Sequence, residues 1–422
     1  MSVTRLRRED RVTGGNEKYG RLRTNLQNLI DAGHPYTKRM AERGIRPEHI
    51  KDYADLALLP TTTKYDILNN YPKGWFARED RDIVRIQASS GATGKPAFVA
   101  YTAGDIRMWS ENVAWCMGLS GVNENDTVHV AFGYGLFTGG FGAHDGAGLL
   151  GAMVVPMSGG HTDRQISIMK DLGATVLACT PSYALRIAEA LDEHGRDGLS
   201  LRLGFFGAEA WSDELRSSLE ERLGLKALDM YGLSEAMGPG VSVECRRQDG
   251  LHISDDFIAE VLDPDTLERV DYGREGELVV TAWNKEAFPV IRYRTRDLTS
   301  LMDSPCLCGE PTPRMARVRG RSDDMLILKG VNVFPTQIET AVCGVPGLTP
   351  HFQITVWRER GIQKINVVCE RASDTTPDDV GKIQDELSNS IKRNIGVTFP
   401  FEIAEPGAIP RSYDKAVRIL KR

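Results

Sequence analysis

Residues 152–179 read AMVVPMSGGHTDRQISIMKDLGATVLAC, and this stretch decides the fold class. Ala152–Pro156 and Thr175–Cys179 are short apolar runs typical of buried strands, and Thr162–Leu172 between them has the apolar spacing of an amphipathic helix. A strand, a helix and a second strand in this order predict an α/β sheet.

The same alternation continues on both sides of this stretch. We expect a buried strand at Val128–Phe132 and a helix at Ser182–His194, whereas Glu277–Trp283 is typical of a strand in a more antiparallel subdomain. Glycine and charge interrupt the pattern at 319–324. The residues beyond that point contain further strand-like runs and an amphipathic helix at Asp378–Ile395, which is enough for a small α+β domain.

The length and charge of the chain limit its possible functions. The chain has 422 residues and a mass of 46.7 kDa, which predicts two or more domains. A formal net charge of −6 argues against a nucleic-acid-binding protein, which should be basic. Anionic ligands must therefore be held by local lysine, arginine and backbone N–H groups.

The sequence favours a cytoplasmic protein with no membrane partner. Residues 1–8 are charged and lack the apolar run of a signal peptide. The most membrane-like stretch is 136–157, but its glycines and its central His144 and Asp145 predict a buried core segment instead. Seven scattered cysteines, an odd number, do not suggest a disulfide framework.

Residues 89–96, Ser-Ser-Gly-Ala-Thr-Gly-Lys-Pro, have the composition of a phosphate-binding loop. Two glycines allow backbone N–H groups to turn toward an anion, and three hydroxyls and one ammonium add further donors. The loop is not a Walker A motif, because its spacing is shorter and Pro96 follows the lysine. Considered alone, the pattern also fits a flexible Gly/Ser turn.

Four further stretches carry residues suited to a nucleotide. Tyr231–Glu235 combines an aromatic ring that can stack on a base with a carboxylate that can hold Mg²⁺. Tyr293–Asp297 offers a carboxylate to the hydroxyls of a ribose, Gly320–Asp324 lies at the domain junction, and Pro410–Arg418 places a lysine near the end of the chain. Each stretch alone also fits a turn or a solvated face, but their joint occurrence favours one site.

With these motifs in this order, the chain resembles the adenylate-forming (acyl-/aryl-CoA synthetase) superfamily, and most closely its phenylacetate–CoA ligase branch. The resemblance covers nearly the whole chain, and Gly133–Gly140, Pro156–Gly160, Gly330–Pro335 and the C-terminal lysine stretch point to the branch. It implies a large N-terminal multi-layer α/β domain (residues 1–322) with a small barrel-like β subdomain. A small, mobile C-terminal α+β lid domain (residues 323–422) would follow.

The resemblance also implies a two-step reaction that uses ATP, Mg²⁺ and coenzyme A. ATP and a small aryl carboxylic acid would first form an acyl-adenylate and pyrophosphate, after which the lid would swing and the CoA thiol would displace AMP. Phenylacetate is the default acid, benzoate-type acids are rivals, and a homodimer is expected by resemblance. Two alternatives stay open: an enzyme that loads the aryl group onto a carrier-protein thiol, and a non-catalytic nucleotide-binding protein.

The resemblance assigns residues to each part of the nucleotide. The residues that would wrap the β- and γ-phosphates are Ser89, Ser90, Gly91, Thr93, Gly94 and Lys95. Those that would line the adenine pocket are Gly207, Ala208, Glu209, Tyr231 and Gly232. Ser234 would contact the phosphate or acyl region and Glu235 would bind Mg²⁺. Asp297 would hold the ribose, with Arg321 nearby.

The C-terminal part would supply the moving elements. Lys415 would reach the acyl carboxylate and the α-phosphate during adenylation and then leave with the lid. Asp323 would be the hinge, and Gly330 would contact the CoA arm in the second conformation. Two positions depart from the family pattern: Ala92 replaces a serine or threonine, and Asp414 replaces the glycine that usually precedes the lysine. The Asp414 carboxylate would favour the charged form of the lysine or compete with the substrate for it.

The acyl pocket is expected along the segment that follows the strand at 128–132. Its predicted lining residues are Tyr134, Phe137, Gly139, Gly140 and Phe141. The two phenylalanines would cover an aryl ring and the two glycines would leave it room. Phe141 fits an ordinary core residue equally well, and His144 is expected to be a core histidine, with substrate contact as the alternative.

Four residues form a possible structural zinc site, namely Cys245, His252, Cys306 and Cys308. Cys₃His is a common closed tetrahedral zinc set, although the long gap between the two halves fits no ordinary zinc finger. Members of the ligase branch show such a four-ligand pattern, so the resemblance strengthens the expectation. The zinc would tie the loop after Glu235 to the stretch before the hinge; the alternative is free thiols and a surface histidine.

Overall fold

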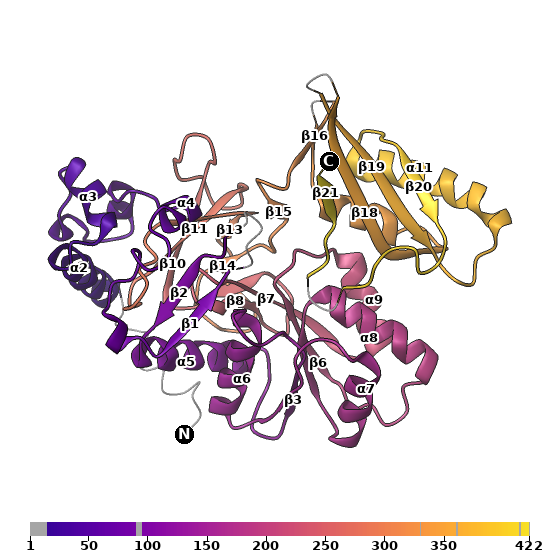
Figure 1. Ribbon diagram of the computed structural model, residues 1–422, viewed down its shortest axis with the longest axis horizontal. Helices are drawn as coiled ribbons and strands as arrows, with labels where there is room; N and C mark the ends of the chain where they lie inside the picture. The colour runs from indigo at the N-terminus through magenta and orange to yellow at the C-terminus, as the bar shows by residue number, and fades with distance from the viewer. Residues whose placement is uncertain (1–14, 90–94, 330, 360–361, 413–414, 422) are drawn as a thin grey trace.

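A computed structural model describes residues 15–89, 95–329, 331–359, 362–412 and 415–421. The protein consists of a large N-terminal part, a small antiparallel sheet packed beside it, and a smaller C-terminal part (Figure 1). The fold is mixed α/β, which confirms the prediction from the alternation of strands and helices.

The centre of the N-terminal part is a nine-stranded sheet of order β13-β14-β9-β8-β7-β6-β5-β3-β4. Its strands are β3 (Thr127–Val130), β4 (Met153–Pro156), β5 (Val176–Cys179), β6 (Leu203–Gly207), β7 (Lys226–Leu233), β8 (Gly238–Glu244), β9 (Leu251–Ile253), β13 (Leu301–Met302) and β14 (Arg314–Met315). The strands from β4 to β7 run parallel, and those from β7 to β13 pair antiparallel. The three strands expected between residues 128 and 179 are thus confirmed as β3, β4 and β5.

Helices cover both faces of this sheet. One face carries α5 (Ala103–Leu119) and α6 (Thr138–Leu150), and the other carries α7 (Thr162–Asp171), α8 (Pro181–His194) and α9 (Asp213–Leu223). Strand β5 shows why its sequence is apolar throughout. Val176 and Ala178 belong to the core beneath α5 and α6, while Leu177 and Cys179 belong to the core beneath α7 to α9. Successive side chains of a strand alternate between its faces, and here both faces are buried.

The 136–157 stretch forms α6 and β4, and the glycines of α6 allow it to pack closely on its neighbours. A Cβ atom at Gly142 would lie 2.4 Å from Pro239, and one at Gly146 would lie 2.5 Å from Val113 of α5. The prediction of a glycine-rich segment packed within the fold is therefore confirmed. In the described portion of the chain, no helix combines the length and the apolar content needed to cross a membrane.

The carboxyl ends of the parallel strands meet at one edge of the nine-stranded sheet. The segments that leave this edge are 131–137 after β3, 180–182 after β5, 208–212 after β6 and 234–237 after β7. Ligands of open α/β sheets bind at such an edge, because loops from several strands converge there.

The N-terminal part contains further helices and a hairpin that precede the central sheet in the chain. They are the helices α2 (Gly15–Asp31), α3 (Pro35–Glu42) and α4 (Lys64–Leu68), the 3₁₀ turns η2 (Pro47–His49), η3 (Ala54–Leu58) and η4 (Asp80–Asp82), and the antiparallel hairpin β1 (Arg85–Ala88) and β2 (Phe98–Tyr101). The β subdomain is an antiparallel sheet of β10 (Phe257–Leu262), β11 (Gly276–Ala282), β12 (Tyr293–Thr299) and β15 (Gly320–Arg321). Its register pairs Asp297 with Arg321.

The C-terminal part has its own sheet and its own core. Its elements are β16 (Leu326–Leu328), β17 (Val331–Val333), α10 (Pro335–Cys343), β18 (Leu348–Glu359), β19 (Ile362–Arg371), η5 (Pro377–Asp379), α11 (Val380–Ile395), β20 (Phe401–Ala404) and β21 (Ile419–Lys421). The sheet order is β20-β19-β18-β21, and the core residues all lie between Leu326 and Ile419. In Figure 1 this part sits above α8 and α9. A separate core supports a domain boundary near residue 322, which stays a prediction.

Candidate active site

A cavity of about 710 Å³ lies where the carboxyl edge of the nine-stranded sheet meets the antiparallel sheet and the C-terminal part. The predicted site residues on its wall are Ser89, Phe137, Ala208, Glu209, Tyr231, Gly232, Ser234, Glu235, Asp297, Arg321, Asp323 and Lys415. Motifs that are far apart in the sequence therefore share one space, which supports their assignment to a single site.

Other predicted residues lie off this wall or outside the described residues. Those in the described portion that do not line the cavity are Lys95, Tyr134, Gly139, Gly140, Phe141 and Gly207. Those outside the described residues are Ser90, Gly91, Thr93, Gly94 and Gly330, together with the departures Ala92 and Asp414. At Gly207 a Cβ atom would lie 2.2 Å from the carbonyl oxygen of Met230, so the pairing of β6 with β7 requires glycine there.

The hairpin of β1 and β2 holds the two ends of the predicted phosphate loop. The backbone N–H of Ser89 donates to the carbonyl of Ala97 (3.0 Å), and the N–H of Ala97 donates to the Ser89 hydroxyl (3.3 Å). The side chain of Lys95 is exposed, with Nζ 5.3 Å from the ring centroid of Tyr71. These two bonds hold Ser89 and Ala97 together on the two sides of the loop, and Ser89 lies on the cavity wall.

Tyr231, Asp297 and Arg321 form one hydrogen-bonded group on the cavity wall. The Tyr231 hydroxyl donates to Asp297 Oδ2 (2.5 Å), and Arg321 Nη1 donates to Asp297 Oδ1 (3.2 Å). Burial raises the pKa of Asp297, whereas the Arg321 guanidinium and the Tyr231 hydroxyl lower it. The carboxylate is therefore oriented by two donors and faces a space where it can accept bonds from sugar hydroxyls.

Two lysines that the sequence analysis did not single out hold Glu235 in place. Lys64 Nζ of α4 lies 3.4 Å from a carboxylate oxygen of Glu235, which is itself buried. Lys285 Nζ donates to the carbonyl of Ala236 (2.7 Å) and so fixes the turn that follows Glu235. Burial lowers the pKa of Lys285 to about 7, although the nearby carboxylates of Asp105 and Glu235 raise it. The Glu235 carboxylate can offer hard oxygen ligands to Mg²⁺.

Glu209 joins the carboxyl edge of the sheet to the C-terminal part. One carboxylate oxygen accepts bonds from the backbone N–H (3.2 Å) and the hydroxyl (2.7 Å) of Ser182, and the other accepts a bond from the N–H of Ala416. Burial raises the pKa of Glu209, and these donors lower it. The preceding Ala208 has a φ of 71°, a left-handed conformation that alanine rarely adopts and that is more frequent at functional sites.

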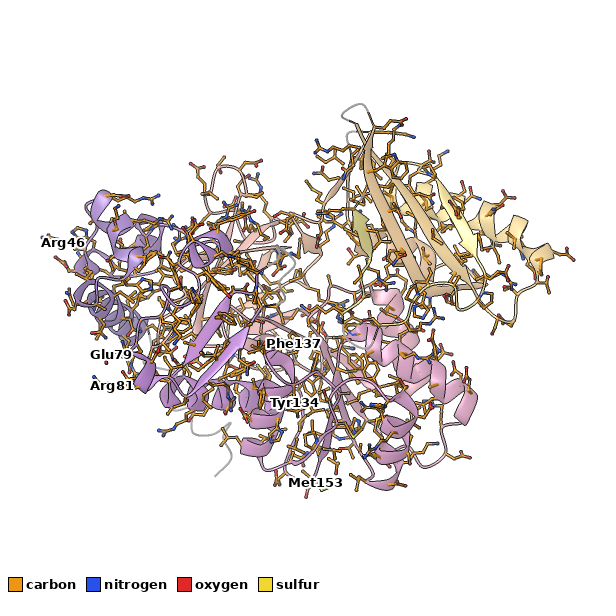
Figure 2. The ribbon with its side chains drawn as sticks, viewed as in Figure 1. Arg46, Glu79, Arg81, Tyr134, Phe137 and Met153 are labelled. Carbon is orange, nitrogen blue, oxygen red and sulfur yellow. The ribbon has the colours of Figure 1, made fainter. Side chains whose placement is uncertain are left out.

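Lys415 enters the cavity from the C-terminal part, on the segment that leads into β21. Its side chain is exposed to the cavity, with Nζ 5.6 Å from the ring centroid of Phe137. In Figure 2, Phe137 lies near the middle of the molecule, with Tyr134 close below it. Lys415 therefore faces the segment that sequence analysis assigns to the acyl group.

The other residues of the predicted acyl segment pack mainly on each other. Tyr134 meets Phe141 edge to face, with ring centroids 5.2 Å apart, and its hydroxyl lies 3.3 Å from Nδ1 of His144. His144 is half-buried rather than a core residue as expected, because its ring sits at the side of α6 against Tyr134. Phe141 lies beneath the guanidinium of Arg85 at 4.9 Å.

Gly139 and Gly140 are surrounded by the chain itself. A Cβ atom at Gly139 would lie 2.7 Å from the ring of Phe137, and one at Gly140 would lie 2.7 Å from the carbonyl oxygen of Gly133. In this arrangement the two glycines allow the start of α6 to fold against the preceding loop. The space beside them is filled by protein, and the prediction that they leave room for a substrate ring stays a prediction.

The four predicted zinc ligands lie together at the antiparallel end of the nine-stranded sheet. Their ligand atoms all lie within 4.8 Å of one another, with 3.7 Å between the sulfurs of Cys245 and Cys306 and 3.4 Å between the Cys308 sulfur and His252 Nε2. Tetrahedral zinc with Zn–S bonds of about 2.3 Å places two sulfurs about 3.8 Å apart. The residues therefore fit a zinc ion.

The surroundings of His252 also suit a metal ligand. Its Nδ1 lies 3.2 Å from the Thr312 hydroxyl, which fixes the ring with Nε2 toward the three sulfurs. Burial, together with Arg314, lowers the pKa of His252 to about 4, so the imidazole is neutral at pH 7, as a ligand must be.

Two comparisons assign the chain to a family. The family model of AMP-binding enzymes matches residues 42–283, and that of the AMP-binding enzyme C-terminal domain matches residues 330–422. The phenylacetate–coenzyme A ligase of Pseudomonas putida is 45% identical over 406 residues, which cover 94% of this chain and 92% of that protein. The chain belongs to the AMP-binding enzymes, in their phenylacetate–CoA ligase branch. This confirms the resemblance indicated by the motifs.

Two solved structures of one relative describe the arrangement of the C-terminal part. A 2-hydroxyisobutyryl-CoA ligase in the postadenylation state, in complex with 2-HIB-AMP, is 25% identical and has a TM-score of 0.91, covering 98% of this chain and 90% of that one. The same ligase in the thioesterification state, with 2-HIB-AMP and CoA, is 26% identical over 97% and 90% of the two chains and has a TM-score of 0.71. The present chain therefore matches the postadenylation arrangement of that ligase better than its thioesterification arrangement.

Proposed function

We propose that this chain is an AMP-forming ligase that joins a small aryl carboxylic acid to coenzyme A, with phenylacetate as the default acid and benzoate-type acids as rivals. The observation that carries the proposal is the 45% identity, over 94% of the chain, to a phenylacetate–coenzyme A ligase. The cavity that gathers Glu235, Asp297 and Lys415 supports it. The carrier-protein alternative is not favoured, because the curated relative is named for coenzyme A.

In the first step, an oxygen of the acid attacks the α-phosphorus of ATP, and the bond to pyrophosphate breaks. The carboxylate is a poor electrophile until AMP becomes its leaving group. Lys415 would place positive charge beside the acid and the α-phosphate, where two anions must approach each other. Asp297 and Tyr231 would fix the ribose and the base, and Ser234 would contact the phosphate or acyl region.

The pyrophosphate portion would be held by the loop between β1 and β2, including Lys95. Mg²⁺, when bound, would neutralise phosphate charge, and Glu235 would hold it. Glu235 is presented by Lys64 and by the turn that Lys285 fixes.

In the second step, the CoA thiol gives up its proton to solvent water, its sulfur attacks the acyl carbon, and the bond to AMP breaks, so that AMP leaves as its phosphate anion. The lid would turn about Asp323 before this step, so that Lys415 leaves and the segment at Gly330 approaches the CoA arm. The better match of this chain to a postadenylation structure than to a thioesterification structure supports a lid with two arrangements.

A structural zinc ion at Cys245, His252, Cys306 and Cys308 is part of the proposal. Four protein ligands leave no open position for water, so the ion would have no part in the chemistry. The proposal also includes a cytoplasmic location, which the lack of a disulfide among the seven cysteines favours. A homodimer is expected from the resemblance alone, and light scattering of the purified protein would test it.

The substrate class is tested by a pyrophosphate-release assay with ATP and Mg²⁺. The acids are phenylacetate, benzoate, anthranilate, hydroxybenzoates and a fatty acid, each with and without CoA. We expect release with an aryl acid and a CoA thioester by mass spectrometry. Release without a thioester would point to a carrier-protein acceptor, and release with the fatty acid alone would contradict the aryl proposal.

Replacing Tyr231 with phenylalanine is expected to weaken ATP binding and to change its pH dependence. The ring is kept, but Asp297 loses one donor, so the KM for ATP should rise about fivefold. Because the Tyr231 hydroxyl lowers the pKa of Asp297, its loss should raise that pKa further. As the pH is lowered, the variant should therefore lose ATP binding at a higher pH than the original protein does. Initial rates against ATP across pH 5–8 would measure both effects.

The matched control for this prediction is Tyr272→Phe, which removes a hydroxyl from an exposed tyrosine away from the cavity. It should leave the KM for ATP unchanged at every pH. If Tyr231→Phe behaved in the same way as this control, the hydrogen bond to Asp297 would have no role in ATP binding.

A further inference from the structure

Among the described residues, four glutamates accept hydrogen bonds across the junction between the N-terminal and C-terminal parts. One of them, Glu214 of α9, accepts a bond from the Thr340 hydroxyl (2.9 Å). Glu189 of α8 accepts bonds from His351 Nε2 (2.5 Å) and Arg411 Nε (3.2 Å). The other two, Glu209 and Glu339, accept bonds from Ala416 and Arg418, which follow Lys415 on the cavity wall.

Glu209 and Glu339 each accept a hydrogen bond from a main-chain N–H of the opposite part, so the two bonds cross the junction in opposite directions. Glu209 belongs to the N-terminal part and accepts a bond from the N–H of Ala416. Glu339 belongs to α10 of the C-terminal part and accepts a bond from the N–H of Ser212 (2.7 Å), the residue that caps α9. Each part thus supplies one carboxylate to the backbone of the other, and Glu339 is almost fully buried.

Both carboxylates act on the segment that carries Lys415. The N–H of the Lys415–Ala416 peptide donates to Glu209, and its carbonyl accepts a bond from the Ser412 hydroxyl (2.7 Å). Three residues further on, Arg418 Nη2 donates to Glu339 (2.9 Å). The backbone that presents the lysine is therefore held directly by Glu209 and, through Arg418, by Glu339.

These bonds depend on the present arrangement of the two parts. Glu209 and Ser212 lie in the segment after β6, whereas Ala416 and Glu339 belong to the C-terminal part, so a rotation of that part would separate both pairs. A carboxylate that accepts a main-chain N–H forms a charge-assisted bond, which is stronger than a bond between neutral groups.

We propose that Glu209 and Glu339 are positioning residues that hold Lys415 in place for adenylation and are released when the lid turns. The proposal rests on the proposed function, because it assigns these residues to one of its two steps. It assigns to Glu209 a role beyond the adenine pocket, and it gives Glu339 a role that no motif indicated. Neither carboxylate takes part in the chemistry.

The test measures the two half-reactions separately in Glu339→Ala and Glu209→Gln. Adenylation is followed by ATP–pyrophosphate exchange with the accepted acid, and thioester formation is followed from supplied acyl-adenylate and CoA. Exchange should fall about tenfold in either variant, while thioester formation in Glu339→Ala stays within about twofold of the original protein. The control Glu386→Gln removes a carboxylate of α11 that makes no contact with the N-terminal part among the contacts the structure describes, and it should change neither rate.

Loss of both half-reactions to the same extent in Glu339→Ala would overturn the proposal. Unchanged exchange in both variants would overturn it as well. Absence of exchange in the original protein with every acid would instead count against the proposed function.

A second measurement does not depend on activity. Trypsin cleaves after lysine, and the Lys415–Ala416 bond is held on both sides in the present arrangement. Its cleavage, followed by mass spectrometry under native conditions, should be at least about threefold faster in both variants than in the original protein or in Glu386→Gln. Equal cleavage rates in all four proteins would contradict the proposed role of the two glutamates.

Discussion

Replacing Lys415 with alanine is expected to slow acyl-adenylate formation about 10²–10³-fold, which is the usual cost of removing one preorganised charge from an active site. The side chain is exposed to the cavity and supports no core, so the variant should fold normally. Only the adenylation step places the acid and the α-phosphate beside the lysine. Thioester formation from supplied acyl-adenylate should therefore be nearly unchanged.

ATP–pyrophosphate exchange and the conversion of supplied acyl-adenylate measure these two rates. Lys392→Ala, which removes an exposed lysine of α11, is the control and should leave both rates unchanged. Adenylation at the original rate in Lys415→Ala would show that another group supplies the charge. An equal loss of both half-reactions would show that Lys415 is not specific to the first step.

Replacing Cys245 with serine is expected to remove the zinc and to lower the free energy of unfolding by about 4 kcal/mol, because loss of a structural metal is among the largest effects of single substitutions. Cys245 follows β8, His252 lies in β9, and the other two ligands precede β14, so the ion would join three neighbouring strands. Elemental analysis should find about one zinc ion per chain in the original protein and none in the variant. Thermal unfolding measures the loss of stability.

Cys343→Ser is the matched control, because Cys343 is half-buried and lies outside the cluster. It should retain the zinc and most of the stability. A chelator should lower the melting temperature of the original protein and of Cys343→Ser, but not that of Cys245→Ser. Fully active and stable protein purified without zinc would rule the site out.

The alternation of apolar strands and amphipathic helices was sufficient to predict the central sheet. β5 was predictable because both of its faces are buried, so that Val176 to Cys179 form an uninterrupted apolar run. The arrangement of the C-terminal part was not predictable in this way. It depends on a few polar contacts such as Glu339 with Ser212, and such contacts leave no periodic pattern in the sequence.

The site shows the same division between local motifs and tertiary contacts. Tyr231 to Glu235 and Asp297 were found from the sequence because each motif combines the right chemistry within a few residues. Lys64 was missed because it meets Glu235 only through the packing of α4, far away along the chain. Lys285 was missed for a similar reason, since its role depends on burial beneath the turn at Ala236. His144 was assigned to the core from its apolar neighbours, although α6 places it at a half-buried side.

The most direct test of the proposed reaction is to follow ¹⁸O from the carboxyl group of phenylacetate during turnover with ATP, Mg²⁺ and CoA. If a carboxylate oxygen attacks the α-phosphorus, the AMP that is released must carry ¹⁸O in its phosphate, with phenylacetyl-CoA as the second product. Mass spectrometry of AMP and the thioester reads both products from one sample. Labelled AMP together with the thioester is the predicted result, whereas thioester formation with unlabelled AMP, or with ADP and labelled inorganic phosphate, would contradict an acyl-adenylate pathway.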